Sequence, residues 1–437
     1  MMALQEPEGT KDLPPEEAKF YNDFINTAYR IFSRYAYKAI ELPMFEQTEL
    51  FVRGIGSATD VVSKELFQLV SGENLKKMLS GEDIKNKSRF SMRPEGTAGA
   101  VRYAVQHGLA SIADKPLKIM YAGPMFRAER PEKGRQRQFN QIGIECLGAS
   151  QASIDAEAIA MLMQFYEEIG LDRRNLRLLI NSMGCDSCRP KFKEKLADYL
   201  EQNIEEMCED CNRRAKTNSM RTFDCKNETC IEIMKNAPRI SDYLCPSCES
   251  HHTQVKELLT NIGIDFEESY SLVRGLDYYT KTVFEVQVKR GLGSQNAIGG
   301  GGRYDRLAQE IGGEPVCGLG FALGYERCLL ALSAGGMKFE QTPDCEVFIC
   351  NVDSSTITQA FVLLQNLRNA DVSAEMDHQG RSLKSQFKIA DRSGASYVFV
   401  VGQDELAEGK VILRNMASSE EIKLDVNEAT QKCSELL

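Results

Sequence analysis

The chain has 437 residues, of which 42% are hydrophobic and 27% are charged, and its formal net charge is −10. This length predicts two or three folded domains, and the composition excludes a chain that is disordered overall. The acidic balance excludes a uniformly basic surface, so contacts with nucleic acid would have to use local basic patches.

Several broad classes are disfavoured by what the sequence lacks. No apolar run reaches the length that spans a membrane, so we expect no membrane partner. The N-terminus has no basic segment followed by an apolar one, which argues against a secretory signal and predicts a cytoplasmic protein. Only four histidines are present, a thin supply for a Ser-His-Asp or Cys-His hydrolase.

The first third of the chain begins with a helix and continues into short strands. Apolar residues at helical spacing predict a long amphipathic helix over residues 16–37. A strand follows over residues 39–45, and Pro43 places it at an edge or an interface because proline donates no ladder hydrogen bond. We then expect a strand over residues 89–93 that runs into a helix ending near residue 106.

Glu95 lies at this switch from strand to helix, and two roles fit it. A carboxylate there can point into a cleft and bind an amine. Alternatively, Glu95 and Thr97 can cap the first turn of the following helix. The local sequence leaves both readings open.

An antiparallel hairpin with a basic loop comes next, with strands predicted over residues 118–126 and 138–147. Five basic residues fall within eleven positions of this stretch, against only two acidic ones: Arg127, Arg130, Lys133, Arg135 and Arg137, with Glu129 and Glu132. Guanidinium groups held at strand ends are rigid bidentate partners for phosphate. The alternative is an ordinary solvated hairpin tip.

A helix over residues 154–170 and a strand over 176–181 lead into a cysteine-rich segment, which we interpret as an inserted subdomain. Its four cysteine pairs are Cys185 and Cys188, Cys208 and Cys211, Cys225 and Cys230, and Cys245 and Cys248. The first two pairs are separated by 19 residues, as in a zinc ribbon. The eight thiols could hold one or two structural Zn²⁺ ions, or they could be reduced, buried thiols without metal.

Two glycine-rich stretches follow a strand expected over residues 283–288. The run Gly299–Gly302 would let the backbone approach a ligand closely, or would form a flexible turn. Residues 316–332 predict a strand and then a helix, and their glycines are spaced GxGxxxG. This spacing differs from the GxGxxG of dinucleotide-binding folds and excludes that interpretation.

The C-terminal part predicts a small α/β domain with a mostly parallel sheet. Strands are expected over residues 345–352, 372–376 and 396–402, helices over 355–370 and 381–392, and two short strands end near residue 424. On the second helix a basic stripe is predicted from the spacing of Arg381, Lys384, Lys388 and Arg392. Its alternative is a solvated helix face.

Taken together, these motifs resemble class II aminoacyl-tRNA synthetases, and among them histidyl-tRNA synthetases. Residues 41–43 resemble motif 1, the dimer-forming element, residues 126–131 with 138–141 resemble motif 2, and residues 318–327 resemble motif 3. Residues 272–279 and 301–305 are similar to the histidine-specific signatures of the family. The resemblance covers nearly the whole chain.

The resemblance implies an α+β fold, with an antiparallel sheet flanked by helices, an insertion and a C-terminal α/β anticodon-binding domain. The implied boundaries are a catalytic core over 1–180 and 261–333, an insertion over 181–260, a linker over 334–343 and an anticodon-binding domain over 344–437. The implied activity is a histidine–tRNA ligase that uses ATP and Mg²⁺, first forming histidyl-adenylate and then charging tRNA(His). A cytoplasmic homodimer is the implied assembly.

The resemblance also implies residue roles. Arg127 and Arg274 would contact the α-phosphate of ATP, Arg327 its γ-phosphate end, and Phe139 the adenine, with Arg135 as a further phosphate contact. The histidine substrate would be held by Glu95, Gly96, Thr97, Gln141, Glu145, Tyr278 and Tyr279. Candidate tRNA contacts are Arg130 and Glu132 at the acceptor end, and Arg381, Lys384, Lys388 and Arg392 at the anticodon.

A different function class remains as the alternative. Regulatory subunits of ATP phosphoribosyltransferase resemble synthetases and bind histidine without charging tRNA. Such a protein would lack the anticodon domain and usually the adenylation arginines. Here Arg127, Arg274, Arg327 and the C-terminal domain are all present, which favours the ligase.

Overall fold

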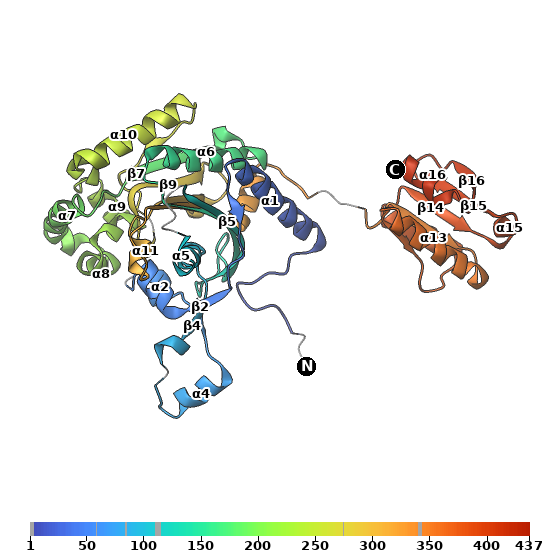
Figure 1. The fold of residues 1–437 in the computed structure, drawn as a ribbon, viewed down its shortest axis with the longest axis horizontal. Coiled ribbons are helices and arrows are strands. Elements are labelled where there is room, and N and C mark those ends of the chain that lie inside the picture. Colours follow the sequence, from blue (N-terminus) through green and yellow to red (C-terminus); the bar gives the residue numbers. More distant parts are fainter. Residues whose placement is uncertain (1–3, 58, 84, 110–114, 274, 340–342) are drawn as a thin grey trace. The chain divides into compact units, whose positions relative to one another are not determined.

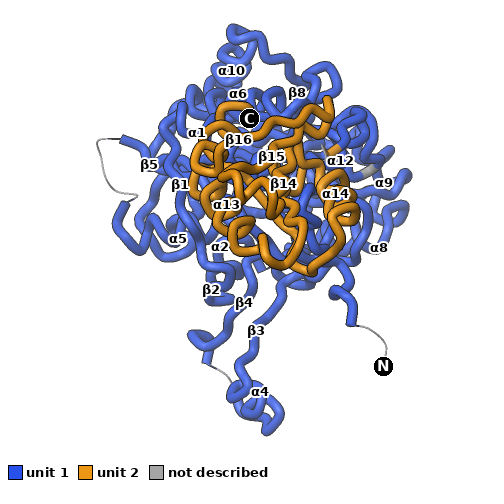
Figure 2. The backbone as a smooth tube through the Cα atoms, turned by 90° about the vertical axis from the view of Figure 1, so that its right-hand side faces the viewer, with its two compact units in different colours: residues 1–338 blue, residues 339–437 orange. Residues whose placement is uncertain are grey.

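The computed structural model describes residues 4–57, 59–83, 85–109, 115–273, 275–339 and 343–437 (Figure 1). The chain divides into two compact units, residues 1–338 and 339–437, coloured separately in Figure 2. Among the described helices, none has both the length and the apolar character needed to cross a membrane.

The larger unit is built on an eight-stranded sheet in the order β1-β5-β6-β11-β10-β9-β7-β8. Its six central strands pair antiparallel, as predicted from the resemblance: β5 (Leu117–Phe126), β6 (Gln138–Leu147), β11 (Gly318–Gly324), β10 (Ala297–Arg303), β9 (Thr280–Val288) and β7 (Leu176–Ser182). Two-residue strands, β1 (Lys38–Ala39) and β8 (Glu267–Glu268), pair parallel at the two edges.

Alternation along the strands assigns one face of the sheet to a large apolar core. On β6, Ile142 and Ile144 enter this core, and so does Phe321 on β11. Three helices contribute to the same core: α1 (Pro15–Arg34), α6 (Ala152–Glu168) and α10 (Pro246–Asn261). The intervening residues of β6, including Gln141 and Glu145, therefore point to the opposite face, which carries the candidate site.

Small residues keep that opposite face open on β10 and β11. On β11 the alternating partners of Leu319, Phe321 and Leu323 are glycines or alanine. The glycine run at 299–302 belongs to β10 and is paired on both sides, so the flexible-turn alternative is wrong. A Cβ on Gly301 would overlap the backbone of β11, which explains the glycine sterically.

Helices α5 (Thr97–Gln106) and α11 (Leu307–Glu310) join a second core with the insertion helices α7 (Arg189–Asn203), α8 (Glu209–Thr217) and α9 (Glu228–Met234). In this core Phe192 and Leu196 of the insertion belong to the same buried cluster as Tyr278 and Tyr279. The insertion is therefore packed into the unit that carries the candidate site. Helix α12 (Tyr325–Ala334) follows β11 directly.

A small antiparallel sheet, β2-β4-β3, precedes this region: β2 (Phe45–Gln47), β4 (Phe90–Met92) and β3 (Gln68–Leu69). The connections between these strands contain the helices α2 (Thr48–Ile55), α3 (Asp60–Ser63) and α4 (Gly72–Leu79). The single strand predicted over residues 39–45 is wrong, because β1 ends at Ala39 and β2 begins at Phe45. Between them, the Leu42 carbonyl accepts a 2.8 Å hydrogen bond from the Arg93 side chain instead of a ladder bond.

The smaller unit has a five-stranded sheet, β13-β12-β14-β15-β16, with bounds Ala374–Met376, Val347–Asn351, Tyr397–Val401, Lys410–Asn415 and Glu421–Asp425. The first three strands are parallel, as expected, but β15 and β16 pair antiparallel, so the sheet is mixed. Its helices are α13 (Ile357–Asn369), α14 (Leu383–Arg392), α15 (Gln403–Ala407) and α16 (Ala429–Leu436). The last two were not predicted.

Candidate active site

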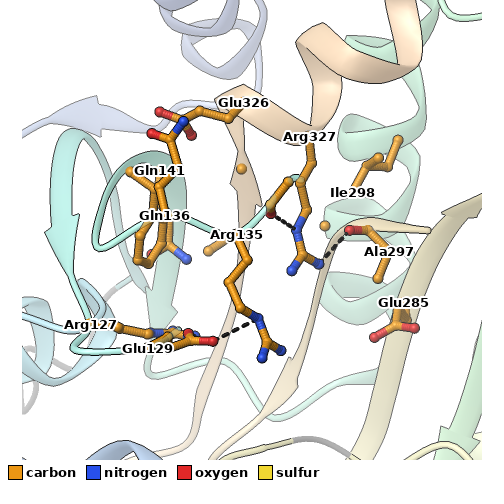
Figure 3. Close-up of a pocket in the computed structure, with 15 residues that line it drawn as sticks. Arg127, Glu129, Arg135, Gln136, Gln141, Glu285, Ala297, Ile298, Glu326 and Arg327 are labelled. Atoms are coloured by element: carbon orange, nitrogen blue, oxygen red, sulfur yellow. Dashed lines mark hydrogen bonds and ion pairs between the residues drawn. The ribbon is translucent and has the colours of Figure 1, made fainter. Parts of the chain in front are cut away.

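A polar pocket lies on the open face of β6, β10 and β11, below the start of α12 (Figure 3). It brings together residues from the β5–β6 hairpin, from the central strands and from α12. Five of the residues proposed from the sequence line it: Arg127, Arg135, Phe139, Gln141 and Arg327. They come from positions up to 200 residues apart, counted from Arg127 to Arg327.

Arg127 is the first residue after β5 and is fixed by its surroundings. Its backbone N–H donates to the Arg137 carbonyl at 2.9 Å, and its Nε donates to the Pro94 carbonyl at 3.0 Å. The guanidinium lies 5.2 Å from the centre of the Phe139 ring. One cation and one aromatic face are thus presented side by side to the pocket.

The hairpin loop turns tightly before Arg135. Glu132 and Arg135 exchange two backbone hydrogen bonds of 3.0 and 2.9 Å, and Gly134 between them adopts a φ of 78°. The Arg135 side chain then reaches back to Glu129 at 2.6 Å. Arg130 and Glu132 are exposed at the loop, and Glu132 accepts a hydrogen bond from Gln295 at 2.8 Å.

Arg327 lies in the first turn of α12 and is held by three acceptors. Its guanidinium donates to the carbonyls of Gly134 and Ala297, each at 2.9 Å (Figure 3). It also donates to Gln295 Oε1 at 3.2 Å. Burial lowers its pKa, and the nearby cations Arg135 and Arg127 lower it further. A cluster of cations that repel one another attracts a polyanion strongly.

Glu326, which the sequence analysis did not assign, joins α12 to β6. Its two carboxylate oxygens accept the Asn140 backbone N–H at 2.9 and 3.0 Å. Burial raises the pKa of Glu326. The neighbouring Gln141 lies on β6, which pairs with β5 on one side and with β11 on the other. Gln141 and Glu326 both line the pocket.

A second group of candidate residues is buried and does not line this pocket. Glu95 is 5% exposed, and its carboxylate accepts the backbone N–H groups of Thr97 and Ala98 at 2.7 and 2.9 Å. Glu95 thus caps the first turn of α5, which is one of the two roles that the sequence left open. Burial raises the pKa of Glu95, although the helix hydrogen bonds oppose that shift.

Glu145, which is fully buried, is surrounded by tyrosines. The Tyr121 hydroxyl donates to it at 3.1 Å, and the Tyr304 hydroxyl donates to its other oxygen. Burial raises the pKa of Glu145 to about 8. Its oxygens are thus anchored, and its carboxyl is poised to change protonation near neutral pH. Tyr121 and Tyr304 were not assigned roles from the sequence.

Glycines make room for the buried side chains of Glu145, Tyr121 and Tyr304. A Cβ on Gly96 or Gly143 would overlap the Tyr121 ring, and a Cβ on Gly318 would overlap the Tyr304 ring. A Cβ on Gly320 would overlap the Glu145 carboxylate. The structure thus gives Gly96 a steric role.

Tyr278 and Tyr279 are 4% and 7% exposed, with ring centres 4.7 Å apart. The Tyr278 ring also packs edge-on against Tyr304 at 5.7 Å, which links it to the Glu145 group. Burial raises the pKa of Tyr278, and the carboxylates of Glu95 and Glu145 act in the same direction. Arg274, the remaining arginine proposed from the sequence, lies outside the described residues.

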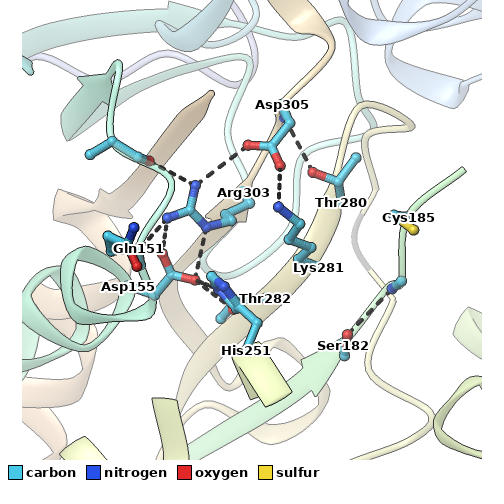
Figure 4. A network of polar contacts seen from close by, with 12 residues as sticks. Gln151, Asp155, Ser182, Cys185, His251, Thr280, Lys281, Thr282, Arg303 and Asp305 are labelled. Carbon is cyan, nitrogen blue, oxygen red and sulfur yellow. Dashed lines mark hydrogen bonds and ion pairs between the residues drawn. The ribbon is translucent and has the colours of Figure 1, made fainter. Parts of the chain in front are cut away.

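A buried ion pair, also missed by the sequence analysis, fixes the end of β10, directly before Tyr304 (Figure 4). Arg303 and Asp155 are fully buried and 2.7 Å apart, and Thr282 donates to the same carboxylate at 2.6 Å. His251 Nε2 lies 2.7 Å from Asp155 Oδ2. Residues of α6, α10, β9 and β10 therefore meet at one carboxylate. The only sequence signal was the position of Arg303 within the 301–305 signature.

The eight insertion cysteines form two groups of four: Cys185, Cys188, Cys245 and Cys248, and Cys208, Cys211, Cys225 and Cys230. The zinc-ribbon grouping suggested by the first two pairs is therefore wrong. Short spacing in the sequence does not decide the grouping, because the fold brings the last pair back to the first.

On α14 the basic residues Lys384, Lys388 and Arg392 are exposed. Arg381 precedes the helix, which begins at Leu383, and is paired with Asp377 at 2.7 Å. The predicted four-residue stripe is thus three helical residues with Arg381 beside them. Arg381, Lys388 and Arg392 line a shallow depression together with Asp391.

Comparisons with known proteins match both units. A family model described as histidyl-tRNA synthetase matches residues 9–328, and one described as anticodon binding domain matches residues 346–436. A histidine–tRNA ligase from Halothermothrix orenii is 42% identical over 423 residues, covering 97% of both chains. One from Clostridioides difficile is 40% identical over 436 residues, covering 99% of this chain and all of the relative.

Solved structures give the same picture. Apo histidyl-tRNA synthetase from S. aureus matches with a TM-score of 0.80 and 34% identity, covering 98% of this chain and 99% of that one. A Bacillus halodurans protein titled as an ATP phosphoribosyltransferase regulatory subunit/histidyl-tRNA synthetase matches with a TM-score of 0.61 at 18% identity, over 92% of this chain and 98% of its own. That second likeness shows a shared fold.

Proposed function

The chain belongs to the histidyl-tRNA synthetase family, and we propose how its own residues carry out the reaction of a histidine–tRNA ligase. In the first step the carboxylate of L-histidine attacks the α-phosphorus of ATP, which forms histidyl-adenylate and releases pyrophosphate. In the second step a hydroxyl of the terminal tRNA ribose attacks the activated carbonyl, and AMP leaves. The observation that carries the assignment is the convergence of Arg127, Arg135 and Arg327 with Phe139 in one pocket.

The arginines would act on the charge that develops at phosphorus. Arg127 is fixed at a strand end and would contact the α-phosphate, while Arg327 would hold the γ-phosphate end. Preorganised donors of this kind stabilise the transition state without reorganisation during the reaction. Phe139, which already packs against Arg127, would stack on the adenine. Arg135 is a further phosphate contact, and Arg274 would approach the α-phosphate as well.

Mg²⁺ is used with ATP in this family of enzymes, and the pocket offers hard oxygen ligands that suit it. Glu285 and Glu326 line the pocket beside the arginines and would be its protein ligands. The ion would offset part of the charge of the phosphates. Arg127 and Arg327 would still fix the orientation of the triphosphate, because their positions are set by hydrogen bonds to the backbone.

The amino-acid substrate would lie between Gln141 and the buried group of Glu95, Thr97, Glu145, Tyr278 and Tyr279. Glu95 and Thr97, next to Gly96, would bind the α-ammonium group, and Gln141 the polar atoms beside it. Glu145 and the two tyrosines would read the imidazole nitrogens. An amino acid without those nitrogens would leave buried polar groups unpaired, which is a large penalty.

Transfer RNA would contact both units. Arg130 and Glu132, exposed at the hairpin loop, would meet the acceptor end, and the basic residues of α14 with Arg381 would meet the anticodon. The likeness of residues 346–436 to an anticodon binding domain supports the second contact. Phosphate contacts of this kind make binding dependent on salt.

A cytoplasmic homodimer is the assembly that we propose. Exposed apolar residues occur on and beside the small β2-β4-β3 sheet, with Phe45 53% and Val70 43% exposed. A second copy of the chain would cover such residues. All fourteen cysteines are free thiols, which suits a reducing compartment. The insertion cysteines are proposed as structural metal ligands, a role apart from the ligase reaction.

Histidine-dependent exchange of pyrophosphate into ATP, followed by charging of tRNA(His), tests the function. We expect both activities from the purified chain. The alternative is a regulatory protein that binds histidine only. Histidine binding measured by calorimetry without any exchange would therefore reject the ligase assignment. The presence of the C-terminal unit and of Arg127 and Arg327 in the pocket favours the ligase.

A further inference from the structure

We infer that the insertion holds two separate tetrahedral zinc ions, and that the fold pairs the cysteines differently from their order in the sequence. One ion would be bound by Cys185, Cys188, Cys245 and Cys248, here called the base tetrad. The other would be bound by Cys208, Cys211, Cys225 and Cys230, here called the inner tetrad. Within each tetrad the four sulfur atoms lie within 4.8 Å of one another.

The sulfur spacing fits a tetrahedron around zinc. A Zn–S bond of about 2.3 Å places tetrahedral sulfur atoms about 3.8 Å apart. In the base tetrad, Cys185 Sγ lies 3.6 Å from Cys188 Sγ and 3.8 Å from Cys245 Sγ. In the inner tetrad, Cys208 Sγ lies 3.7 Å from Cys225 Sγ. These separations far exceed the disulfide bond length of about 2.05 Å, and all eight cysteines are free.

Backbone groups around the sulfur atoms favour thiolates. Cys188, Cys208 and Cys245 each occupy the residue just before a helix, namely α7, α8 and α10. The positive ends of these helices stabilise negative charge on sulfur.

Direct hydrogen bonds to sulfur add to this effect. The Cys245 N–H donates to Cys188 Sγ at 3.1 Å, and the Cys208 N–H donates to Cys230 Sγ at 3.2 Å. In each tetrad, then, the backbone of one ligand supports the sulfur of another. Such outer contacts are typical of built metal sites.

The ligand set selects the metal and its role. Four thiolates in a tetrahedron suit Zn²⁺ or iron, and four protein ligands leave no open position for a substrate. The inner tetrad links the short helices α8 and α9, of 9 and 7 residues, which would be marginal alone. A structural ion therefore supplies stability that these helices lack.

The base tetrad has a different place in the fold. Cys185 lies three residues after the end of β7, and Cys245 directly precedes α10. The Gly184 carbonyl accepts a 2.8 Å hydrogen bond from the Lys281 backbone on β9. An ion here would join the entry and exit of the insertion at the edge of the catalytic sheet.

Elemental analysis of the full-length chain, purified without chelator from zinc-supplemented medium, tests the inference. We expect two zinc ions per chain. The variant with serine at Cys208, Cys211, Cys225 and Cys230 should retain one ion, because only the inner tetrad is lost. If the pairs grouped in sequence order, the same variant would retain none, since both sites would lose ligands. Cys317→Ser, outside the tetrads, should retain two.

A second measurement does not depend on the folding of a variant. An organic mercurial added to the unaltered chain should release two zinc ions per chain, detected with a zinc indicator dye. Zinc near zero, or iron with visible absorption in its place, would overturn the inference. One ion per chain in the unaltered protein would overturn the two-site grouping.

Discussion

Two of the three pocket arginines, Arg127 and Arg327, are held in place by backbone carbonyls, so their positions do not depend on a bound ligand, whereas Arg135 is paired with Glu129. Arg127 uses Nε to bond Pro94, and Arg327 bonds Gly134 and Ala297. These bonds leave other guanidinium N–H groups for phosphate. Burial and repulsion from Arg135 and Arg127 lower the pKa of Arg327, and the charge of a bound anion would offset both effects.

Replacing Arg127 with glutamine tests whether this side chain stabilises the transition state of adenylation. We expect the rate of ATP–pyrophosphate exchange to fall by about 100–1000-fold, since a preorganised donor to the transition state is lost. Thermal unfolding should change little, because Arg127 is half-buried at the pocket wall. Arg130→Gln, in the same loop but exposed, is the matched control and should keep its exchange rate. Equal losses in both variants would contradict the assignment.

Glu145 gives a second prediction, on stability against pH. Its pKa is about 8 in the folded chain, against an ordinary value of 4.5. The folded state thus holds a proton that the unfolded state releases, so this group's stabilising contribution is full below pH 4.5. It is lost as pH rises toward 8, by at most about 1.4 kcal/mol per pH unit.

Urea unfolding of the wild type and of Glu145→Gln, measured from pH 5 to 8, checks this expectation. The wild type should lose stability across the range, and the variant should lose less because glutamine does not ionise. Glu132→Gln, at the exposed hairpin loop, is the control and should follow the wild type. Parallel slopes for wild type and Glu145→Gln would show that Glu145 is not the titrating group.

For single residues, the sequence predicted the site side chains that belong to contiguous motifs, such as Arg127, Phe139 and Arg327, which line the pocket. It did not predict Tyr121 or Asp155, whose roles exist only through partners far away in the chain. Tyr121 has a role because its hydroxyl donates to Glu145 on the other strand of the hairpin. Asp155 has one because it accepts a hydrogen bond from Arg303, which comes 148 residues later. No local spacing carries that information.

Among the elements, the insertion supports the loop that carries the two tyrosines of the candidate histidine pocket. Arg221 donates to the Gly275 carbonyl at 3.0 Å, and Asn218 donates to Asp277 at 2.7 Å. Arg189, in the first turn of α7, donates to the Tyr279 carbonyl. The pocket arginines on the hairpin and on α12 bond to other parts of the core.

Arg221→Gln should therefore raise KM for histidine about tenfold, equivalent to about 1.4 kcal/mol of binding, and leave KM for ATP within about twofold. Steady-state exchange assays with each substrate varied give both constants. Arg213→Gln, on the neighbouring helix and paired only with Asp210 among the described residues, should match the wild type. An equal rise in both constants would mean that the insertion supports the whole site without distinction.

The elements themselves were predicted where the pattern is local. A short apolar run predicted β5 and alternation predicted β6 almost to the residue, and helical spacing predicted α1. The single strand predicted over residues 39–45 was wrong because Arg93, the residue directly after β4, donates to the Leu42 carbonyl. The two short strands that end near residue 424 are present as β15 and β16, but their antiparallel direction was not predicted, because alternation of elements does not report strand direction.

For the whole molecule, the pocket is lined by residues of the larger unit, whereas the match to an anticodon binding domain lies in the smaller unit. The smaller unit has its own apolar cores, built around Val347 and Phe399 in one case and Phe348 and Val398 in the other. The exposed basic residues of α14 therefore belong to a unit that has its own hydrophobic cores. Changes on that helix should alter tRNA binding without altering adenylation.

Replacing Lys384, Lys388 and Arg392 together with glutamine should raise KM for tRNA(His) at least several-fold. The dependence of log affinity on log salt should fall by about 0.7 for each lost phosphate contact. Filter binding at several salt concentrations measures both, and ATP–pyrophosphate exchange should stay at the wild-type rate. Lys423→Gln on β16 is the control within the same unit. Unchanged tRNA affinity would remove α14 from the proposed interface.

The glycines around Tyr121, Tyr304 and Glu145 have a consequence for how this sequence can evolve. Gly96, Gly143, Gly318 and Gly320 have no room for a methyl group while those three side chains are present. Gly96, Gly143 and Gly318 can therefore gain a side chain only after Tyr121 or Tyr304 has been replaced by a smaller residue, and Gly320 stays closed even without Glu145 because of the Ile144 carbonyl. A chain selected for a different amino acid would have to begin at an open position such as Gln141.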